Sequence, residues 1–189
     1  MKISALILAA GSGSRIGTPK LMLEYKEKSF LRLITDKILA AGIPDITCVV
    51  TDKTLDWAMK NVPEIHYVIN PNPDDGMLSS LFYGVEIIED NENILINPVD
   101  HPFVEVETYK LLIRESDRYA TSIVKPEYKN KTGHPVIIPN DLAKSIRLED
   151  SDSGLNEVIK KSGYHQVYVE VLDRGILKNV NTLDDLNVI

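Results

Sequence analysis

The sequence predicts a Rossmann-like α/β domain with three layers, in which helices cover both faces of a mixed, mainly parallel sheet. Apolar runs of strand length alternate with helical patterns, and the first strand leads directly into a glycine-rich stretch. The alternation weakens in the second half, which indicates that the sheet is not wholly parallel. A chain of 189 residues and 21.2 kDa fits one such domain over residues 1–189.

The first half alternates regularly. A buried strand is predicted over residues 3–8, and a helix then begins after the N-cap Ser29 and ends at Gly42. β-Branched residues predict a strand over 46–50. The following elements are expected to be a helix over 55–60, a strand over 65–69, a helix starting near Gly76, a strand over 94–96 that ends in Asn97-Pro98-Val99-Asp100, a helix over 106–116 and a strand over 121–125.

The second half is less regular. Pro135 and Pro139 bracket three β-branched residues, which predicts a short edge strand, because proline cannot donate to a ladder. Two short helices, a strand over 166–172 and a terminal helix from Leu183 complete the prediction. Asp184 and Asp185 are expected in the first turn of that last helix, where they complement its dipole.

Composition and charge exclude several classes of protein. The content of 43% hydrophobic and 26% charged residues is that of a globular chain. With 21 Lys and Arg against 28 Asp and Glu, the net charge is -7, which argues against nucleic acid as a partner. A small phosphate ligand needs only a few well-placed cations.

Targeting and redox signals point to a cytoplasmic protein. No apolar run approaches the roughly 18 residues of a membrane span, so no membrane partner is expected. The apolar stretch from Ala5 to Ala10 is too short for the core of a signal peptide. Cys48 is the only cysteine, which excludes disulfides and cysteine-rich zinc sites.

The most informative stretch is the glycine loop, which we define as residues 8–20. Ligands of open α/β sheets lie outside the carboxyl ends of the strands, where this loop begins. Its glycines let backbone N–H groups approach phosphate oxygens, and Arg15 and Lys20 add two cations. The loop therefore predicts a phosphate site.

Three other interpretations of the loop fit less well. A dinucleotide-binding turn needs G-x-G-x-x-G running into a helix, whereas here the spacing is G-x-G-x-x-x-G and Pro19 interrupts such a helix. A Walker loop needs Gly-Lys followed by Ser or Thr, which the chain lacks. A purely structural turn does not explain two cations beside three glycines.

Six segments, in order along nearly the whole chain, resemble motifs of one family. They are Leu8-Ala9-Ala10-Gly11-Ser12-Gly13-Ser14-Arg15-Ile16-Gly17-Thr18-Pro19-Lys20, Asn70-Pro71 with Gly76-Met77-Leu78-Ser79-Ser80-Leu81, Asp100-His101-Pro102-Phe103, Gly133-His134-Pro135-Val136, Ser151-Asp152-Ser153-Gly154 and Asn179 to Leu186. The chain resembles the molybdenum cofactor cytidylyltransferase and guanylyltransferase group of nucleotidyltransferases with the glycosyltransferase-A-like fold. The resemblance implies transfer of a nucleoside monophosphate to a phosphate-bearing acceptor with release of pyrophosphate.

Three residues are the expected catalytic set. Arg15 and Lys20 would bring two anionic reactants together, and Asp100 would hold Mg²⁺. Asp100 ends an apolar strand, where a lone charge requires a reason, although it could instead cap the segment after Pro102. Asn181 is the expected second metal or acceptor contact. Relatives often have Asp there, so the number of protein ligands stays open.

The resemblance also assigns binding residues. The acceptor is expected to contact His134, Asp152 and Asn181. For His134, a loop position without any binding role is an equal alternative. Asp74 and Asp75 would repel phosphates, so the helix start near Gly76 should face the ribose and base. The nucleotide contacts are expected at Leu8, Ala9, Ala10, Gly11, Ser12, Gly13, Lys20, Asn70, Gly76, Met77 and Ser80.

The motif Ala9-Ala10-Gly11 favours CTP over GTP, because Leu-Ala-Gly-Gly accompanies guanosine in the resembled group and the Ala10 methyl narrows the base pocket. The implied acceptor is molybdopterin, and a molybdoenzyme could receive the product. Three alternatives remain. They are a guanylyltransferase that uses GTP, a nucleotidyltransferase for sugar phosphates or other small phosphates, and a non-catalytic chaperone that binds the cofactor.

Overall fold

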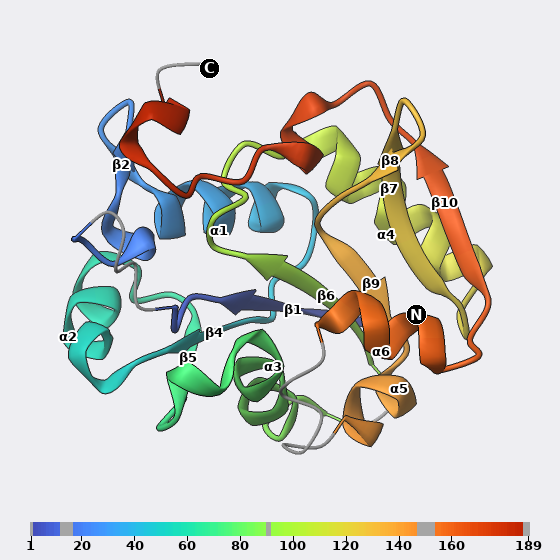
Figure 1. The fold of residues 1–189 in the computed structure, drawn as a ribbon, viewed down its shortest axis with the longest axis horizontal. Helices are drawn as coiled ribbons and strands as arrows, with labels where there is room; N and C mark the ends of the chain where they lie inside the picture. Colours follow the sequence, from blue (N-terminus) through green and yellow to red (C-terminus); the bar gives the residue numbers. More distant parts are fainter. Residues whose placement is uncertain (1, 12–16, 90–91, 147–153, 187–189) are drawn as a thin grey trace.

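Eight strands form one sheet in the computed structural model, which describes residues 2–11, 17–89, 92–146 and 154–186 (Figure 1). The order across the sheet is β10-β7-β9-β6-β1-β4-β5, and β8 pairs with β7. The strands are β1 (Ile3–Leu8), β4 (Ile46–Val50), β5 (His66–Ile69), β6 (Asn93–Pro98), β7 (Ile123–Tyr128), β8 (Lys131–Thr132), β9 (Val136–Ile138) and β10 (Gln166–Glu170). A small separate hairpin pairs β2 (Glu24–Tyr25) with β3 (Lys28–Ser29).

The sheet is mixed and mainly parallel, as predicted. β1 pairs in parallel with β4 and β6, β4 with β5, and β7 with β10. β9 lies between β6 and β7 and is antiparallel to both. The prediction that 135–139 is an edge strand is therefore wrong. Pro135 and Pro139 flank β9 without belonging to it, so residues 136–138 keep the N–H groups that two neighbouring strands require.

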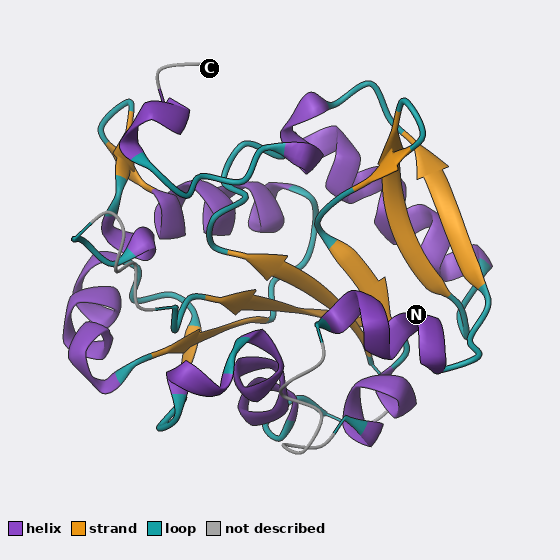
Figure 2. Cartoon of the chain, viewed as in Figure 1, coloured by secondary structure: helices purple, strands orange, loops and turns teal. Residues whose placement is uncertain are grey.

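Helices cover both faces of the sheet (Figures 1 and 2). The helices are α1 (Phe30–Ala40), α2 (Asp52–Asn61), α3 (Met77–Val85), α4 (Val106–Arg118), α5 (Asn140–Ser145) and α6 (Leu155–Lys161). Short 3-10 turns occur at η1 (Lys20–Met22), η2 (Pro73–Asp75), η4 (Arg174–Leu177) and η5 (Leu183–Leu186). No helix among the described residues is long and apolar enough to cross a membrane.

The burial of β1 shows why its sequence is wholly apolar. Ile3, Ala5 and Ile7 join the core cluster that contains residues of α1, α2 and α4. Leu6 and Leu8 join the second cluster, which contains residues of α3, α5 and α6. Because the side chains of a strand alternate between faces, a central strand of a three-layer domain is buried on both sides.

Several boundaries differ from the prediction for local reasons. α2 begins at Asp52, three residues before its predicted start, because the Thr51 N–H donates to Thr54 Oγ1 (3.2 Å) in a capping box. The terminal helix predicted from Leu183 is one 3-10 turn. The β2–β3 hairpin was not predicted. Lys26 and Glu27 adopt left-handed φ values of 49° and 64° and form its turn.

Candidate active site

The carboxyl ends of β1 and β6 build one edge of the sheet. The Val99 N–H donates to Leu8 O (3.0 Å), so the two strands end side by side. The glycine loop leaves β1 at this edge and Asp100 follows β6. β9 is antiparallel to β6, so its N-terminal end lies at the same edge of the sheet, and His134 stands just before that end. Three of the six sequence motifs thus meet there, and a fourth, Asn179 to Leu186, reaches the same edge through Asn181.

Lys20 lies between two oxygen atoms from distant parts of the chain. Its Nζ donates to Asp100 Oδ2 (2.9 Å) and to Asn181 Oδ1 (2.7 Å). The side chains of Lys20 and Asp100 are 18% and 20% exposed, so the cluster is shielded but open to a ligand. Lys20 of the glycine loop and Asp100 after β6 therefore lie together, as expected from the sequence. Their catalytic roles stay predictions.

Asn181 is held in place by its own turn. The Val180 N–H donates to Asp100 O (2.9 Å), which joins this segment to the end of β6. The Asp185 carboxylate accepts from the N–H groups of Asn181 (2.8 Å) and Thr182 (2.7 Å), and these bonds lower the pKa of Asp185. Asp185 therefore caps the last turn directly, and it positions Asn181 next to Lys20.

The cluster fits a magnesium ion in the character of its donors. A carboxylate oxygen of Asp100 and an amide oxygen of Asn181 already share one cation, the Lys20 ammonium. Oxygen donors are the ligands of Mg²⁺, which in phosphate sites takes one or two protein groups and completes its shell with phosphate and water. Within the described ranges no group of three or more His, Cys, Asp or Glu could hold a metal, so a cage made of protein alone is absent there.

The loop between β5 and α3 is shaped by Asn70. The side chain of Asn70 is 1% exposed, and its Nδ2 donates to Ser79 Oγ (2.9 Å) and Ser80 Oγ (3.0 Å). Its Oδ1 accepts from the Asn72 N–H (2.8 Å). The amide is therefore satisfied inside the loop, and it positions the start of α3. Ser80 is also buried, whereas Met77 is half-buried.

Gly76 is the N-cap of α3 and has a φ of 84°, a left-handed value that favours glycine. Asp74 and Asp75 are exposed in η2 just before it. Ala10 is 2% exposed and belongs to the core cluster that contains α3 residues, so its methyl lies on the face of the sheet that α3 covers. Leu8 and Ala9 are also buried, and their contact with the nucleotide stays a prediction. A Cβ on Gly11 would meet nothing within 4 Å.

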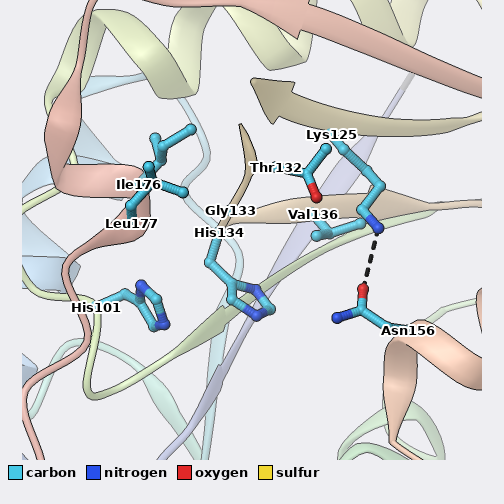
Figure 3. Close-up of a pocket in the computed structure, with 9 residues that line it drawn as sticks. All are labelled: His101, Lys125, Thr132, Gly133, His134, Val136, Asn156, Ile176 and Leu177. Carbon is cyan, nitrogen blue, oxygen red and sulfur yellow. Dashed lines mark hydrogen bonds between the residues drawn. The ribbon is translucent and has the colours of Figure 1, made fainter. Parts of the chain in front are cut away.

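A second hollow adjoins this edge. A pocket of about 160 Å³ is lined by His101, Lys125, Thr132, Gly133, His134, Val136, Asn156, Ile176 and Leu177 (Figure 3). The rings of His101 and His134 have centroids 4.8 Å apart, and His101 Nε2 lies 3.8 Å from Asp100 Oδ1. His134 thus lines a pocket that borders the Asp100 cluster.

Backbone contact fixes the walls of the pocket. The His134 N–H donates to Ile176 O (3.1 Å). A Cβ on Gly133 would lie 2.1 Å from the same carbonyl oxygen, so only glycine allows this approach. The start of β9 and η4 are therefore joined through their main chains, which explains the glycine in the Gly133-His134-Pro135 motif.

The two histidines of the pocket are neutral at pH 7. Burial, with help from neighbouring His101, lowers the pKa of His134 to about 3, and burial lowers the pKa of His101. The Nδ1 atoms of both rings are buried and have no hydrogen-bond partner in the described structure. Neutral imidazoles with an unpartnered nitrogen can donate to or accept from a bound molecule.

Sequence reasoning missed three polar residues of this pocket, Lys125, Thr132 and Asn156. Lys125 follows the buried apolar residues Ile123 and Val124 of β7, and a lone charge next to an apolar strand segment was also the signal that singled out Asp100. Other expected site residues fall outside the described residues. These are Ser12, Gly13 and Arg15 of the glycine loop and Asp152.

The layered fold and the cluster at the carboxyl ends of β1 and β6 define an α/β protein of the nucleotide-binding class. The family model described as the MobA-like NTP transferase domain matches residues 5–167. The chain therefore belongs to the MobA-like NTP transferase family, a family of nucleotidyltransferases.

Individual relatives are distant. The chain is 23% identical over 198 residues to a probable molybdenum cofactor guanylyltransferase of Methanocaldococcus jannaschii, covering 97% of this chain and 96% of that protein. It is 25% identical over 189 residues to the bifunctional protein GlmU of Thermosipho melanesiensis, covering 98% of this chain but 41% of GlmU. The chain thus spans about two fifths of that relative.

The fold recurs in solved structures. A nucleotidyl transferase from Methanothermobacter thermautotroptrophicus superposes with a TM-score of 0.83 at 22% identity, covering 99% of this chain and 95% of the other. Similarity at this level of identity establishes the fold, and it confirms the predicted nucleotidyltransferase architecture.

Proposed function

We propose that this protein transfers CMP from CTP to the phosphate group of a small acceptor, a molybdopterin-type cofactor, and releases pyrophosphate. The observation that carries the proposal is the position of the Lys20 ammonium at the end of the glycine loop, where it is held between Asp100 Oδ2 and Asn181 Oδ1. A cation and a carboxylate at that edge match what a triphosphate with a bound metal needs.

In the proposed reaction, an oxygen of the acceptor phosphate attacks the α-phosphorus of CTP. A new P–O–P bond forms, the bond between the α-phosphorus and the bridging oxygen of the β-phosphate breaks, and pyrophosphate leaves with that electron pair. The acceptor phosphate is already an anion at neutral pH, so no general base is required. The main barrier is repulsion between two anions, which positioned cations offset.

Lys20 is assigned to the triphosphate. Its ammonium has a flexible stem and three N–H donors, so it can turn from Asp100 and Asn181 toward phosphate oxygens. Arg15 of the same loop is proposed as the second cation. Asp100 and Asn181 would hold Mg²⁺, which when bound withdraws charge from the phosphate oxygens and stabilises the leaving pyrophosphate.

The preference for CTP rests on the motif Ala9-Ala10-Gly11, in which Ala10 is buried on the α3 side of the sheet. The second candidate is GTP. Two relatives named probable molybdenum cofactor guanylyltransferase favour it, although they share only 23% and 24% of their aligned residues with this chain.

The deciding experiment compares CTP, GTP, UTP and ATP, each with Mg²⁺, by thermal shift. A ligand that binds only the folded state stabilises it by RT ln(1 + [L]/Kd), so a 100-fold excess over Kd gives about 2.7 kcal/mol. CTP is expected to stabilise most. Selective stabilisation by GTP would replace the base assignment, and no response to any nucleotide would contradict the proposal.

A second measurement tests catalysis. Pyrophosphate release is followed with CTP and a panel of acceptors, namely molybdopterin, sugar phosphates and other phosphate monoesters. Release with molybdopterin alone supports the proposed acceptor, whereas release with a sugar phosphate would reassign it. Tight CTP binding without release on any acceptor would indicate the non-catalytic chaperone.

A further inference from the structure

Lys125 is a buried cation with one neutral partner. The residue is 6% exposed, and its Nζ donates to Asn156 Oδ1 (3.0 Å). No carboxylate of the described chain lies within ion-pair distance of Lys125 Nζ. An ammonium has three donors, and burying it without a counter-charge is costly. Burial and repulsion from Lys160 accordingly lower the pKa of Lys125. The arrangement is explained if the missing counter-charge is a ligand.

The ammonium lies in the pocket that borders the Asp100 cluster. Figure 3 shows the end of the Lys125 side chain beside Asn156, with Thr132 and Val136 on the same wall and the His134 ring facing the hollow. The His134 Nδ1 is a second buried polar atom without a partner. One cation, an amide and a neutral imidazole therefore surround a space of about 160 Å³.

Two histidine rings link the pocket to the Lys20 cluster through a chain of contacts. His101 lies 3.8 Å from Asp100, and its ring is 4.8 Å from that of His134, which lines the same pocket as Lys125. The two histidine rings therefore lie between the Lys20 cluster and the pocket that holds Lys125. A site for two anionic reactants needs such a separation of cations, because each reactant carries its own charge.

We propose that Lys125, with Asn156 and His134, binds the phosphate of the acceptor. The proposal rests on the proposed function, since it assigns the nucleotide to Lys20 and the second substrate to Lys125. The substrate class that follows is a phosphate monoester whose dianion enters the pocket. Acceptors that carry a neutral hydroxyl in place of the phosphate would leave Lys125 without its counter-charge and are excluded.

The first test needs no known substrate. Inorganic phosphate is titrated into the wild-type protein, and backbone amide shifts are followed by NMR. Saturable shifts of the Lys125, Thr132, Gly133 and His134 amides are expected, and they should be lost in Lys125→Gln. Shifts confined to the residues around Lys20 would overturn the assignment.

The second test uses turnover. Lys125→Gln should raise KM for the phosphorylated acceptor about 10- to 100-fold, the effect of losing one charged hydrogen bond, while KM for CTP stays within about twofold. Lys125→Arg keeps the charge and should recover part of the affinity. The control is Lys160→Gln, which removes the exposed charge that acts on Lys125 but does not line the pocket.

The outcomes separate the two proposals. If CTP binds and pyrophosphate is released, but Lys125→Gln leaves KM for the acceptor unchanged, the inference is wrong and the proposed function stands. If phosphate shifts the pocket amides while no nucleotide stabilises the protein, the anion site is supported and the proposed function fails. An equal rise of KM in Lys160→Gln would show a general field effect and overturn the assignment.

Discussion

Lys20 Nζ lies 2.9 Å from Asp100 Oδ2, although 80 positions of the chain separate the two residues. Both side chains keep about a fifth of their surface exposed. Ion pairs with access to water contribute little to stability, because solvent screens them and ordering two side chains costs entropy. The pair can therefore exchange its partners for ligand atoms, which suits the proposed site for a triphosphate.

Replacement of Lys20 tests its role directly. Lys20→Ala should lower turnover by a factor of about 10²–10³, comparable to the loss of one oriented donor to the transition state, with the fold intact. The rate of pyrophosphate release measures the effect. Lys28→Gln is the matched control, because Lys28 in β3 forms an exposed ion pair with Asp36 and, among the described residues, makes no hydrogen bond or ion pair with the Lys20 cluster. Turnover within twofold of wild type in Lys20→Ala would remove Lys20 from the mechanism.

Asp100→Asn keeps the size of the side chain and removes its charge. The variant should lose Mg²⁺-dependent pyrophosphate release, since an amide is a poorer ligand for a hard cation than a carboxylate. A magnesium titration of the activity gives the readout. Asp56→Asn on the exposed side of α2 serves as the control. Normal dependence on Mg²⁺ in Asp100→Asn would show that the metal is held elsewhere.

Asn70 is expected to act through the shape of its loop. Asn70→Ala removes two bonds donated to buried serines and one bond accepted from the Asn72 N–H, so it should lower the free energy of unfolding by about 1–3 kcal/mol. It should also weaken CTP binding, because the start of α3 loses its support. Urea denaturation and a nucleotide titration measure the two effects. Asn61→Ala, at an exposed helix end, should change neither.

The buried histidines make stability sensitive to acid. The pKa of His134 is about 3 in the folded protein and near 6.5 when unfolded, so between these values the unfolded chain binds more protons. The free energy of unfolding should therefore fall as the pH drops below about 6.5, by up to about 1.4 kcal/mol per pH unit for one histidine. His101, whose pKa is also lowered, acts in the same direction.

Urea midpoints at pH 7.5 and pH 5.0 measure this sensitivity. His134→Gln should show a smaller difference between the two pH values than the wild type, because it removes one titrating group. His66→Gln is the control, since His66 is exposed on β5. A wild-type midpoint that is the same at both pH values would contradict the low pKa of His134.

Local and strand-end features could be predicted from the sequence. The buried run of residues 3–8, the Ser29 cap and the helix stop at Gly42 all recur in the structure, since each depends on neighbouring residues. The convergence of Lys20 and Asp100 was also predicted, because the carboxyl ends of parallel strands share one edge of a sheet.

Long-range pairing was not accessible in the same way. The position of β9 between β6 and β7 depends on which strands find each other in three dimensions, and the flanking prolines pointed to an edge. Asn70 was expected to contact the nucleotide, and the structure satisfies its amide within the loop, which no spacing could reveal. Lys125 was missed because its neutral partner, Asn156, comes from a helix 31 positions away.

The close approach of Gly133 to the Ile176 carbonyl has a consequence for substrate choice. Walls that meet through main-chain atoms cannot swing apart by rotating a side chain, so the cavity behind His134 has a set width. A ligand must therefore fit the existing width of the cavity. Broadening the range of acceptors would require replacing side chains that line the cavity, such as Thr132 or Val136, because the backbone of its walls is fixed.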